Sequence, residues 1–283
     1  MKKTLEPYQL IERSIIKKYR KTIWGPFIGA LKRYELIAPG DCIGVCISGG
    51  KDSMLLAKCL QELWCHGSEV PFSLRFLVMD PGYRPENRRQ IEENAALLGI
   101  PVHIFDSPIF RVVGQQTHTP CYLCARMRRG YLYKFAQQLG CNKIALGHHF
   151  DDAIETNLMS MLYGAEMRTM VPKLRSRNFP GMELIRPLYL VRERDILSWV
   201  RYHDLHFLRC ACTVTDGSRE GGSKRDEVKA LIRDLCRRDP QIANNIFRSA
   251  ENVNLQTVLG YHDGSKTVSF LDAYAAQGSI DDE

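Results

Sequence analysis

The sequence predicts an α/β fold in which helices cover both faces of a parallel sheet. Between residues 42 and 185, short apolar segments of strand length alternate with longer segments whose apolar residues recur at helical spacing. Parallel strands need a crossover between them, usually a helix, so this alternation favours a parallel sheet. The expected strands are 42–47, 74–79, 102–105, 143–146 and 184–185, and the expected helices are 54–63, 85–98, 126–139 and 151–163.

Helical segments are expected on both sides of this alternating region. They are 8–21, which is basic and amphipathic, and 27–36, 191–202, 224–237 and 240–253. The polar, glycine-rich segment 213–222 is expected to be an exposed loop, and the tail beyond residue 264 to be loosely ordered. The predicted regions are an N-terminal helical region (1–38), the α/β domain (39–190), a C-terminal helical region (191–260) and a tail (261–283).

The composition is that of an ordinary globular protein. Of 283 residues, 45% are apolar and 25% are charged. No segment approaches the ~20 apolar residues that a membrane span needs, and the charged N-terminus lacks the apolar core of a signal peptide. We therefore expect a cytoplasmic protein without membrane contact. The net charge of +7 is weak evidence for a polyanionic partner.

One loop has the properties of a phosphate-binding site. Ser48-Gly49-Gly50-Lys51-Asp52-Ser53 directly follows the first strand and precedes a helix. Glycines let the backbone approach a ligand, and the N–H groups and dipole at a helix start favour an anion. The two serines add hydroxyl donors and the lysine a positive charge. Small polar residues also make ordinary strand–helix turns, but the six-residue combination in this context favours phosphate binding.

Two other strand ends carry candidate ligand residues. Asp80, in Met79-Asp80-Pro81-Gly82, fits either a ligand contact or simple turn formation. In the second, Leu146-Gly147-His148-His149-Phe150-Asp151-Asp152, the glycine permits close approach and two carboxylates follow. Near phosphates these carboxylates call for a divalent cation, for which Mg²⁺ is suited; alternatively they are only favourable charges at a helix start. The adjacent histidines point in different directions and are therefore poor ligands for one zinc ion. Each is expected to have its hydrogen bonds satisfied or to be exposed.

Four of the ten cysteines do not lie among apolar residues. Cys121 and Cys124 form a Cys-x-x-Cys motif placed just before a helix, within a basic segment. A redox pair, a zinc site and part of an iron–sulfur cluster all remain open for it. Cys210 and Cys212 are the candidate partners, but Cys-x-Cys is unusual for structural zinc. A three-thiolate site with one open position is therefore permitted by the sequence, although it is not proved by it.

Taken together and in order, the motifs resemble those of one known family. These are the loop 48–53, Cys121-x-x-Cys124 followed by Ala-Arg-Met-Arg-Arg-Gly, the segment 146–152, and Met161-Leu-Tyr-Gly-Ala-Glu-Met-Arg-Thr-Met-Val-Pro-Lys173. The combination is similar to the tRNA 2-thiocytidine synthetase family (TtcA-type) of the PP-loop ATP pyrophosphatases, and the similarity extends from the first helix to about residue 255.

The resemblance implies a Rossmann-like PP-loop domain, related to the adenine nucleotide alpha hydrolases, and an ATP-dependent tRNA sulfurtransferase. In that family three cysteines bind a [4Fe–4S] cluster, ATP adenylates the C2 oxygen of cytidine 32 in the anticodon loop, and sulfur displaces AMP. Carried over by motif, ATP and Mg²⁺ would be bound by Ser48, Gly49, Gly50, Lys51, Asp52, Ser53, Asp80, Arg128, Gly147 and Asp152. Catalysis would involve Asp52, Asp152 and the cluster cysteines.

The resemblance assigns Cys121 and Cys124 as two cluster ligands and leaves the third open. The family commonly has Cys-x-x-Cys where this chain has Cys210-Ala211-Cys212, so chain order favours Cys212 and a gapless match permits Cys210. The segment 213–222 is also longer than the usual spacing. No cysteine precedes residue 42 or follows residue 236, which argues against the related 2-thiouridine synthetases with their terminal zinc sites.

The implied partners are tRNA and a sulfide donor such as a cysteine desulfurase, and a homodimer is one option for the oligomeric state. The basic groups 17–21, 126–129 and 168–177 are candidates for phosphate contact, with 126–129 expected nearest the chemistry. Two alternatives differ in class. One is an iron–sulfur relative that acts on another base or as a desulfidase; the other is a zinc-stabilised module that binds a nucleotide or RNA.

Overall fold

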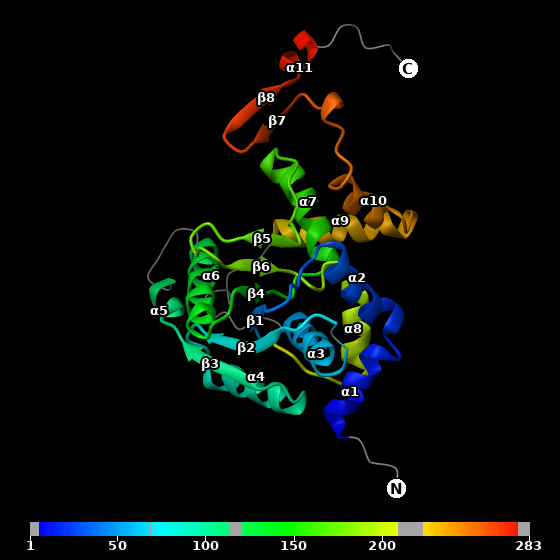
Figure 1. The fold of residues 1–283 in the computed structure, drawn as a ribbon. Coiled ribbons are helices and arrows are strands. Elements are labelled where there is room, and N and C mark those ends of the chain that lie inside the picture. The colour runs from blue at the N-terminus through cyan, green and yellow to red at the C-terminus, as the bar shows by residue number, and fades with distance from the viewer. Residues whose placement is uncertain (1–5, 68, 114–119, 209–222, 277–283) are drawn as a thin grey trace.

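The computed structural model describes residues 6–67, 69–113, 120–208 and 223–276, and its centre is a six-stranded sheet (Figure 1). The strand order is β3-β2-β1-β4-β6-β5. Every neighbouring pair is parallel except β5 and β6, which are antiparallel. The strands are β1 Cys42–Ile47, β2 Ser73–Asp80, β3 Val102–Asp106, β4 Lys143–Ala145, β5 Lys173–Arg175 and β6 Glu183–Ile185. The predicted fold class is confirmed.

Helices cover the sheet on both faces, with α3, α8 and the N-terminal helices on one side and α6 on the other (Figure 1). The helices are α1 Pro7–Ile16, η1 Arg20–Trp24, α2 Gly25–Arg33, α3 Lys51–His66, α4 Pro85–Leu97, α5 Ile109–Val113, α6 Pro120–Gln138, α7 Phe150–Gly164, α8 Glu193–Tyr202, α9 Lys224–Arg238, α10 Ile242–Ser249, η2 Leu255–Thr257 and α11 Phe270–Ala276. None of the helices in the described segments is long and apolar enough to cross a membrane.

Alternation along the strands divides the core into two layers. In β2, Leu77 packs with Tyr133 and Ala136 of α6, whereas its neighbours Phe76 and Val78 belong to the cluster on the opposite face. Successive side chains of a strand point to opposite faces, so a strand that is apolar throughout can fill both layers. This explains why β1 and β2 are almost continuously apolar.

The N-terminal helices and α8 share the core layer of α3. Ile15, Phe27 and Trp199 are fully buried in it, and the hydroxyl of Tyr19 donates to the carbonyl of Ser198 at 3.0 Å. Lys58 of α3 is also fully buried there. Its Nζ lies 2.5 Å from Glu12 Oε1 and donates to the carbonyl of Leu98 at 2.7 Å, so one ammonium group ties α1, α3 and the end of α4 together.

Two sequence predictions about helix bounds are wrong. The single helix expected over 8–21 ends at Ile16, and a π-helical turn follows before α2. The cysteine motif does not precede a helix, because α6 begins at Pro120 and therefore includes Cys121 and Cys124. Proline is well tolerated in the first turn, where its missing N–H is not needed, so it starts this helix.

Two other regions contain structure that the sequence pattern did not reveal. The tail beyond residue 264 was expected to be loosely ordered, but β7 (Gly260–Asp263) and β8 (Lys266–Ser269) form an antiparallel hairpin followed by α11. This part projects from the body of the molecule (Figure 1). β5, within the basic segment 168–177, is an edge strand only three residues long, too short to show an alternating pattern.

The sheet topology creates one switch point. From β1 the chain moves outward through β2 and β3, then returns to the other side of β1 with β4. The loops after β1 and β4 therefore leave the sheet in opposite directions and open a crevice at the carboxyl ends of these strands, where ligands bind in such folds. Ser48 and Gly147 lie in these two loops.

We predict that Lys58→Ala lowers the free energy of unfolding by about 3 kcal/mol, because it removes one partner of a buried ion pair. Glu12→Gln should cost less, since the Glu12 side chain is 14% exposed and an amide can still accept a hydrogen bond. Urea unfolding of both variants measures the difference. A Lys58→Ala protein as stable as the wild type would contradict the role given to this ammonium group.

Candidate nucleotide-binding site

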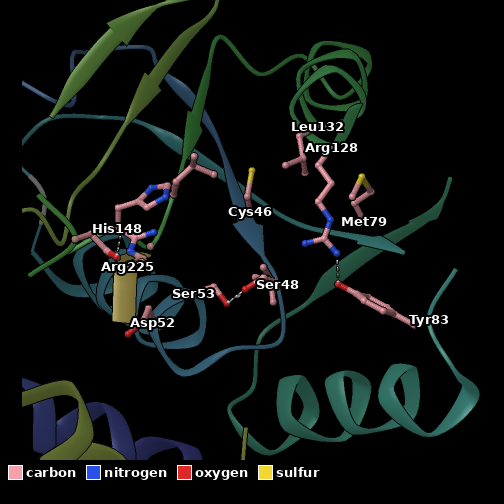
Figure 2. Close-up of a pocket in the computed structure, with 14 residues that line it drawn as sticks. Cys46, Ser48, Asp52, Ser53, Met79, Tyr83, Arg128, Leu132, His148 and Arg225 are labelled. Carbon is pink, nitrogen blue, oxygen red and sulfur yellow. Dashed lines mark hydrogen bonds and ion pairs between the residues drawn. The ribbon is translucent and has the colours of Figure 1, made fainter. Parts of the chain in front are cut away.

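A cavity of about 340 Å³ opens at the switch point between β1 and β4 (Figure 2). Six of the predicted site residues line it, namely Ser48, Asp52, Ser53, Arg128, Gly147 and Asp152. The remaining lining residues are Cys46, Ile47, Met79, Tyr83, Leu132, Leu146, His148 and Arg225. The two strand-end loops and α6 are thus brought together around one space, as the order of the motifs predicts.

The loop after β1 is held in shape by its own serines. Ser53 is buried, and its Oγ accepts from the backbone N–H of Ser48 at 3.1 Å and donates to the carbonyl of Gly50 at 2.9 Å. Gly49 has φ +83°, a conformation that favours glycine, and a Cβ there would lie 2.7 Å from Ile91. The loop delivers the chain into α3 with Gly50 as N-cap, so the first N–H groups of the helix lack intrahelical acceptors and face the loop end.

Gly147 packs directly against the start of α3. A Cβ at this position would lie 2.9 Å from the carbonyl carbon of Asp52 and from the backbone nitrogen of Ser53. Both are backbone atoms that cannot rotate away. The absence of a side chain at residue 147 is therefore what lets the β4 loop and the β1 loop form one continuous wall.

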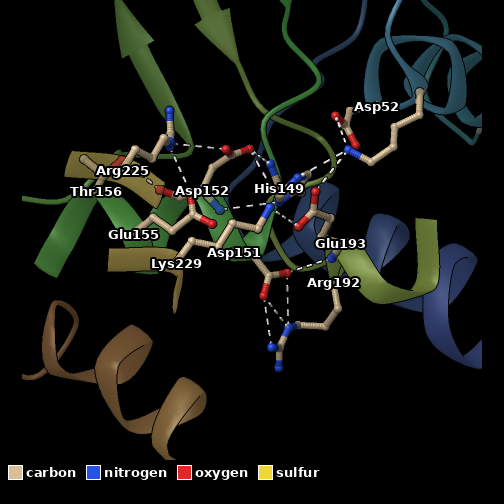
Figure 3. Close-up of polar contacts among 11 residues, drawn as sticks. Asp52, His149, Asp151, Asp152, Glu155, Thr156, Arg192, Glu193, Arg225 and Lys229 are labelled. Carbon is tan, nitrogen blue, oxygen red and sulfur yellow. Dashed lines mark hydrogen bonds and ion pairs between the residues drawn. The ribbon is translucent and has the colours of Figure 1, made fainter. Parts of the chain in front are cut away.

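His149 joins the carboxylates of the two loops. It is buried and caps α7: its Nδ1 accepts from the N–H of Asp152 at 3.4 Å, while Asp152 Oδ2 accepts from the N–H of His149 at 3.0 Å. Its Nε2 lies 3.8 Å from Asp52 Oδ1. The expectation that this histidine is satisfied is confirmed, and its ring separates Asp52 from Asp152 (Figure 3).

The adjacent carboxylates Asp151 and Asp152 do not share a site. Asp151 accepts from the guanidinium of Arg192 at 3.0 Å and from the backbone N–H of Glu193 at 2.7 Å, and it lines a second cavity beside α9. Successive residues in the first turn of a helix point about 100° apart, so only Asp152 faces the nucleotide-side cavity. The expectation that both carboxylates flank the same ligand is wrong.

Lys51 and Asp80 do not line the cavity. Lys51 Nζ lies 3.1 Å from Asp52 Oδ2 and 3.1 Å from Glu193 Oε1. The Asp80 carboxylate accepts from the N–H groups of Gly82 and Tyr83 at 2.8 and 2.6 Å and from Arg88 at 3.1 Å. Of the two roles that the sequence allowed, ligand contact and turn formation, the structure shows turn formation. Asp80 therefore shapes the chain after β2.

Glu193 connects the β1 loop to α9. Its two oxygens lie 3.1 Å from Lys51 Nζ and 2.5 Å from Lys229 Nζ (Figure 3). Burial would raise the pKa of this carboxyl, but the hydrogen bond from Lys229 and the charges of both lysines outweigh it and hold the pKa at about 2. Glu193 is therefore ionised at any physiological pH and keeps both lysines in place.

Arg225, at the beginning of α9, is a site residue that sequence reasoning missed. Its Nε donates to Glu155 at 2.8 Å and its Nη2 to Asp152 at 3.2 Å. The side chain is 44% exposed and forms part of the cavity mouth. Arg225 lies 73 residues after Asp152 in the chain, so no local motif relates the two. The other missed lining residue with a polar tip is Tyr83.

Arg128 of α6 forms the opposite wall (Figure 2). Its Nη2 donates to the hydroxyl of Tyr83 at 3.4 Å, and its guanidinium lies 5.8 Å from the ring centre of Phe110. Cys124 lies one turn before it on the same helix and packs with Met79, Ile109 and Phe110. Cys121 belongs to the first turn of α6, while Cys210 and Cys212 fall outside the described residues.

His148 is neither satisfied nor fully exposed, contrary to expectation. Its Nδ1 is buried without a hydrogen-bond partner. Burial and the nearby positive charge of Arg186 lower its pKa to about 4, so the ring is neutral at pH 7. Buried polar atoms without partners within the described residues also include Asp52 Oδ1 and Arg128 Nε. Since such atoms are costly to leave unpaired, their presence on three residues that line one cavity indicates a polar ligand.

Comparison with known proteins agrees with this geometry. Residues 27–213 match the PP-loop domain family. The tRNA-cytidine(32) 2-sulfurtransferase of Photobacterium profundum is 34% identical over 246 residues, which are 84% of this chain and 77% of the relative. The enzyme of the same name from Coxiella burnetii is 36% identical over 236 residues, 79% of this chain and 86% of the relative.

A solved structure shares the fold. It is the U34-tRNA thiolase NcsA from Methanococcus maripaludis with its [4Fe-4S] cluster, with a TM-score of 0.64, 21% identity, and coverage of 85% of this chain and 78% of the other. A glycine-bearing phosphate loop at the switch point of a parallel sheet, within a matched PP-loop domain, defines a PP-loop ATP-binding protein. More specifically, the chain belongs to the tRNA-cytidine(32) 2-sulfurtransferase family, the 2-thiocytidine synthetases.

We predict that Gly147→Ala weakens ATP binding by at least tenfold, because the new methyl group must push the β4 loop away from the start of α3. Gly164→Ala is the matched control, since a Cβ at residue 164 meets nothing within 4 Å. Titration calorimetry with a non-hydrolysable ATP analogue measures both. Unchanged affinity in a folded Gly147→Ala protein would show that the close approach is not needed.

We also predict that His148 makes the protein less stable in mild acid. The unfolded chain protonates this histidine near its ordinary pKa, whereas the folded protein resists protonation until the pH approaches 4. The contribution of His148 therefore leaves the free energy of unfolding unchanged above pH 6.5. Below pH 6.5 it lowers the free energy of unfolding, by roughly 2 kcal/mol at pH 5. Urea unfolding of His148→Asn at pH 7 and pH 5 should show a smaller loss than in the wild type. Equal losses would rule out this contribution.

Proposed function

We propose that the chain is an ATP-dependent tRNA thiolation enzyme that adenylates the C2 oxygen of cytidine 32 and replaces it with sulfur, using a [4Fe–4S] cluster. The observation that carries the proposal is the position of α6. This one helix contains the Cys-x-x-Cys motif and, one turn later, places Arg128 and then Leu132 in the wall of the nucleotide cavity. One helix thus carries both the cysteine motif and part of the wall of the ATP cavity.

The chemistry requires two stages at one site. The C2 oxygen attacks the α-phosphorus of ATP and pyrophosphate leaves; a sulfur nucleophile then bonds to C2 and the C2–O bond breaks with release of AMP. The exocyclic C2 oxygen is a poor leaving group until it carries the adenylyl group, which explains why a nucleotide site and a sulfur site must be adjacent. The names of the related enzymes supply the substrate.

The β1 loop and the β4 loop supply the groups for ATP. The N–H groups at the start of α3 would donate to phosphate oxygens. The hydroxyl of Ser48, which donates to Ser53 Oγ at 3.3 Å in the structure, would rotate to do the same. Gly147 lets the β4 loop pack on the start of α3, and Arg128 offers a guanidinium to the negative charge that develops as pyrophosphate leaves. Ser53 maintains the loop shape through its hydrogen bonds with Ser48 and Gly50.

Mg²⁺ fits this site through Asp52. One of its carboxylate oxygens, Oδ1, is buried without a hydrogen-bond partner, and Asp52 is one of the residues that line the cavity. An unpaired carboxylate oxygen beside phosphates is the donor that Mg²⁺ uses when it binds through substrate. Asp52 therefore replaces the Asp151–Asp152 pair as the candidate magnesium ligand. Asp152 lines the same cavity, but its carboxylate is already bound by His149 and Arg225.

The cysteines fit an iron–sulfur cluster by the chemistry of their donor atoms. Cys121 and Cys124 are three positions apart within α6, and two thiolates at this spacing are a usual start of a cluster-binding motif. The third ligand would be Cys212 or Cys210. Leu208, the last described residue before these cysteines, donates its N–H to the carbonyl of Gly49 at 3.2 Å. When bound, the cluster would supply sulfur in a nucleophilic form.

Other chain residues would bind and orient the RNA. Arg126 and Arg129 are exposed on α6 beside Arg128, where they can contact phosphates next to the target base. Neutral His148 offers a ring nitrogen to a base or ribose entering the cavity. The sulfide donor, whether a cysteine desulfurase or free sulfide, the cytoplasmic location, the homodimer and the four-region division of the chain remain predictions.

Anaerobic purification followed by iron and sulfide analysis and a tRNA thiolation assay tests the proposal. We expect roughly four irons and four sulfides per chain and AMP formation that depends on tRNA. Cys121→Ser and Cys124→Ser should lose the cluster and thiolation, whereas Cys65→Ser, at an exposed position in α3, should retain both. Zinc without iron, even after cluster reconstitution, or thiolation by the Cys124→Ser protein, would contradict the mechanism.

A further inference from the structure

The cavity has few positive charges for a ligand as anionic as ATP. Two carboxylates, from Asp52 and Asp152, belong to its wall, and the cations among the described lining residues are Arg128 and Arg225. Lys51, the cation of the phosphate loop itself, is engaged by Asp52 and Glu193 and does not contribute to the lining. A polyphosphate in this cavity therefore depends on the two arginines to offset the carboxylates.

Arg225 is built into the site rather than left in solution. Glu155, whose side chain is only 6% exposed, accepts from its Nε, and Asp152 accepts from its Nη2. Burial acts to lower the pKa of Arg225, but the hydrogen bond to Glu155 and the negative charges of the surrounding carboxylates outweigh it and raise the pKa above its ordinary value. Its third nitrogen, Nη1, makes no hydrogen bond to any described residue, so one edge of a fixed guanidinium remains available at the cavity mouth.

The helix that carries Arg225 lies outside the matched PP-loop domain, which ends at residue 213. The same helix, α9, also supplies Lys229, which holds Glu193 and through it Lys51 of the phosphate loop. α9 packs against α7, with Val228 and Ile232 buried beside Ile154, so its distance from both loops is set by a core contact. The contacts of α9 thus reach both halves of the nucleotide site.

We infer that Arg225 is a phosphate-binding residue for ATP and that the PP-loop domain by itself forms an incomplete nucleotide site. Asp152 and Glu155 orient the guanidinium, and its free edge donates to the polyphosphate, opposite Arg128 on the far wall (Figure 2). This inference rests on the proposed function only in requiring that the cavity binds ATP. It assigns to the C-terminal helix a part in the first stage of the reaction.

The test uses the full-length protein and α,β-methylene-ATP, measured by titration calorimetry. Arg225→Gln should raise the dissociation constant about tenfold or more, since it removes a charge-assisted hydrogen bond and leaves Asp152 uncompensated. Lys224→Gln removes one positive charge from the neighbouring residue of the same helix, whose Nζ lies over the ring of Tyr163, and should leave the constant unchanged. Arg225→Lys keeps the positive charge but not the planar pair of guanidinium donors, so its dissociation constant should lie between those of the wild type and Arg225→Gln.

Thermal unfolding of each variant without nucleotide separates binding from folding. Because Arg225 is 44% exposed, its glutamine variant should fold, and the dissociation constant for tRNA should stay at the wild-type value. Equal nucleotide affinity in wild type and folded Arg225→Gln, or equal weakening by Lys224→Gln, would overturn the inference. If the wild type itself bound no nucleotide, the proposed function would fail as well, so the two failures are distinguishable.

Discussion

The structure depends on the contact between Gly147 and the first turn of α3. Two loops that are about a hundred residues apart in the chain meet there backbone to backbone, with no side chain between them. This contact fixes the N–H groups of one helix start beside the N-terminus of another, α7. The start of α7 is capped by His149, whereas the start of α3 has no side-chain cap, so the N–H groups of α3 are the ones that suit a phosphate.

Electrostatic interactions then hold the wall in place and leave selected atoms for a ligand. Asp151, Glu193 and Lys51 are all engaged with protein partners, whereas Asp52 Oδ1, Arg128 Nε and His148 Nδ1 are buried without a hydrogen-bond partner. Burying a polar atom without a hydrogen-bond partner costs free energy, so these atoms destabilise the unliganded fold at the place where a ligand would bind. The lowered pKa of His148 belongs to the same arrangement, since burial beside Arg186 keeps the ring neutral.

Much of the site could be predicted because its parts are local in sequence. A strand end, two glycines and a helix start specify the β1 loop within six residues, and Gly147 with Asp152 specify the second loop in the same way. What failed was the assignment of side-chain direction. Asp151 and Asp152 are neighbours, yet the helix turn sends one to Arg192 and the other to the cavity. Asp80 stands at the right strand end, but the turn after β2 uses its Oδ1 and Arg88 uses its Oδ2.

The sequence by itself determined the fold class, the phosphate loop, the family and the position of the cysteine motif within a basic segment. Each of these can be recognised from the types and spacing of residues that are close together in the chain. Only the tertiary structure decided that α6 carries both the cysteines and a cavity wall, that Lys51 turns to Glu193, and that α9 places Arg225 at the mouth. These facts depend on how distant helices pack on a shared core, and packing geometry leaves no periodic pattern in the chain.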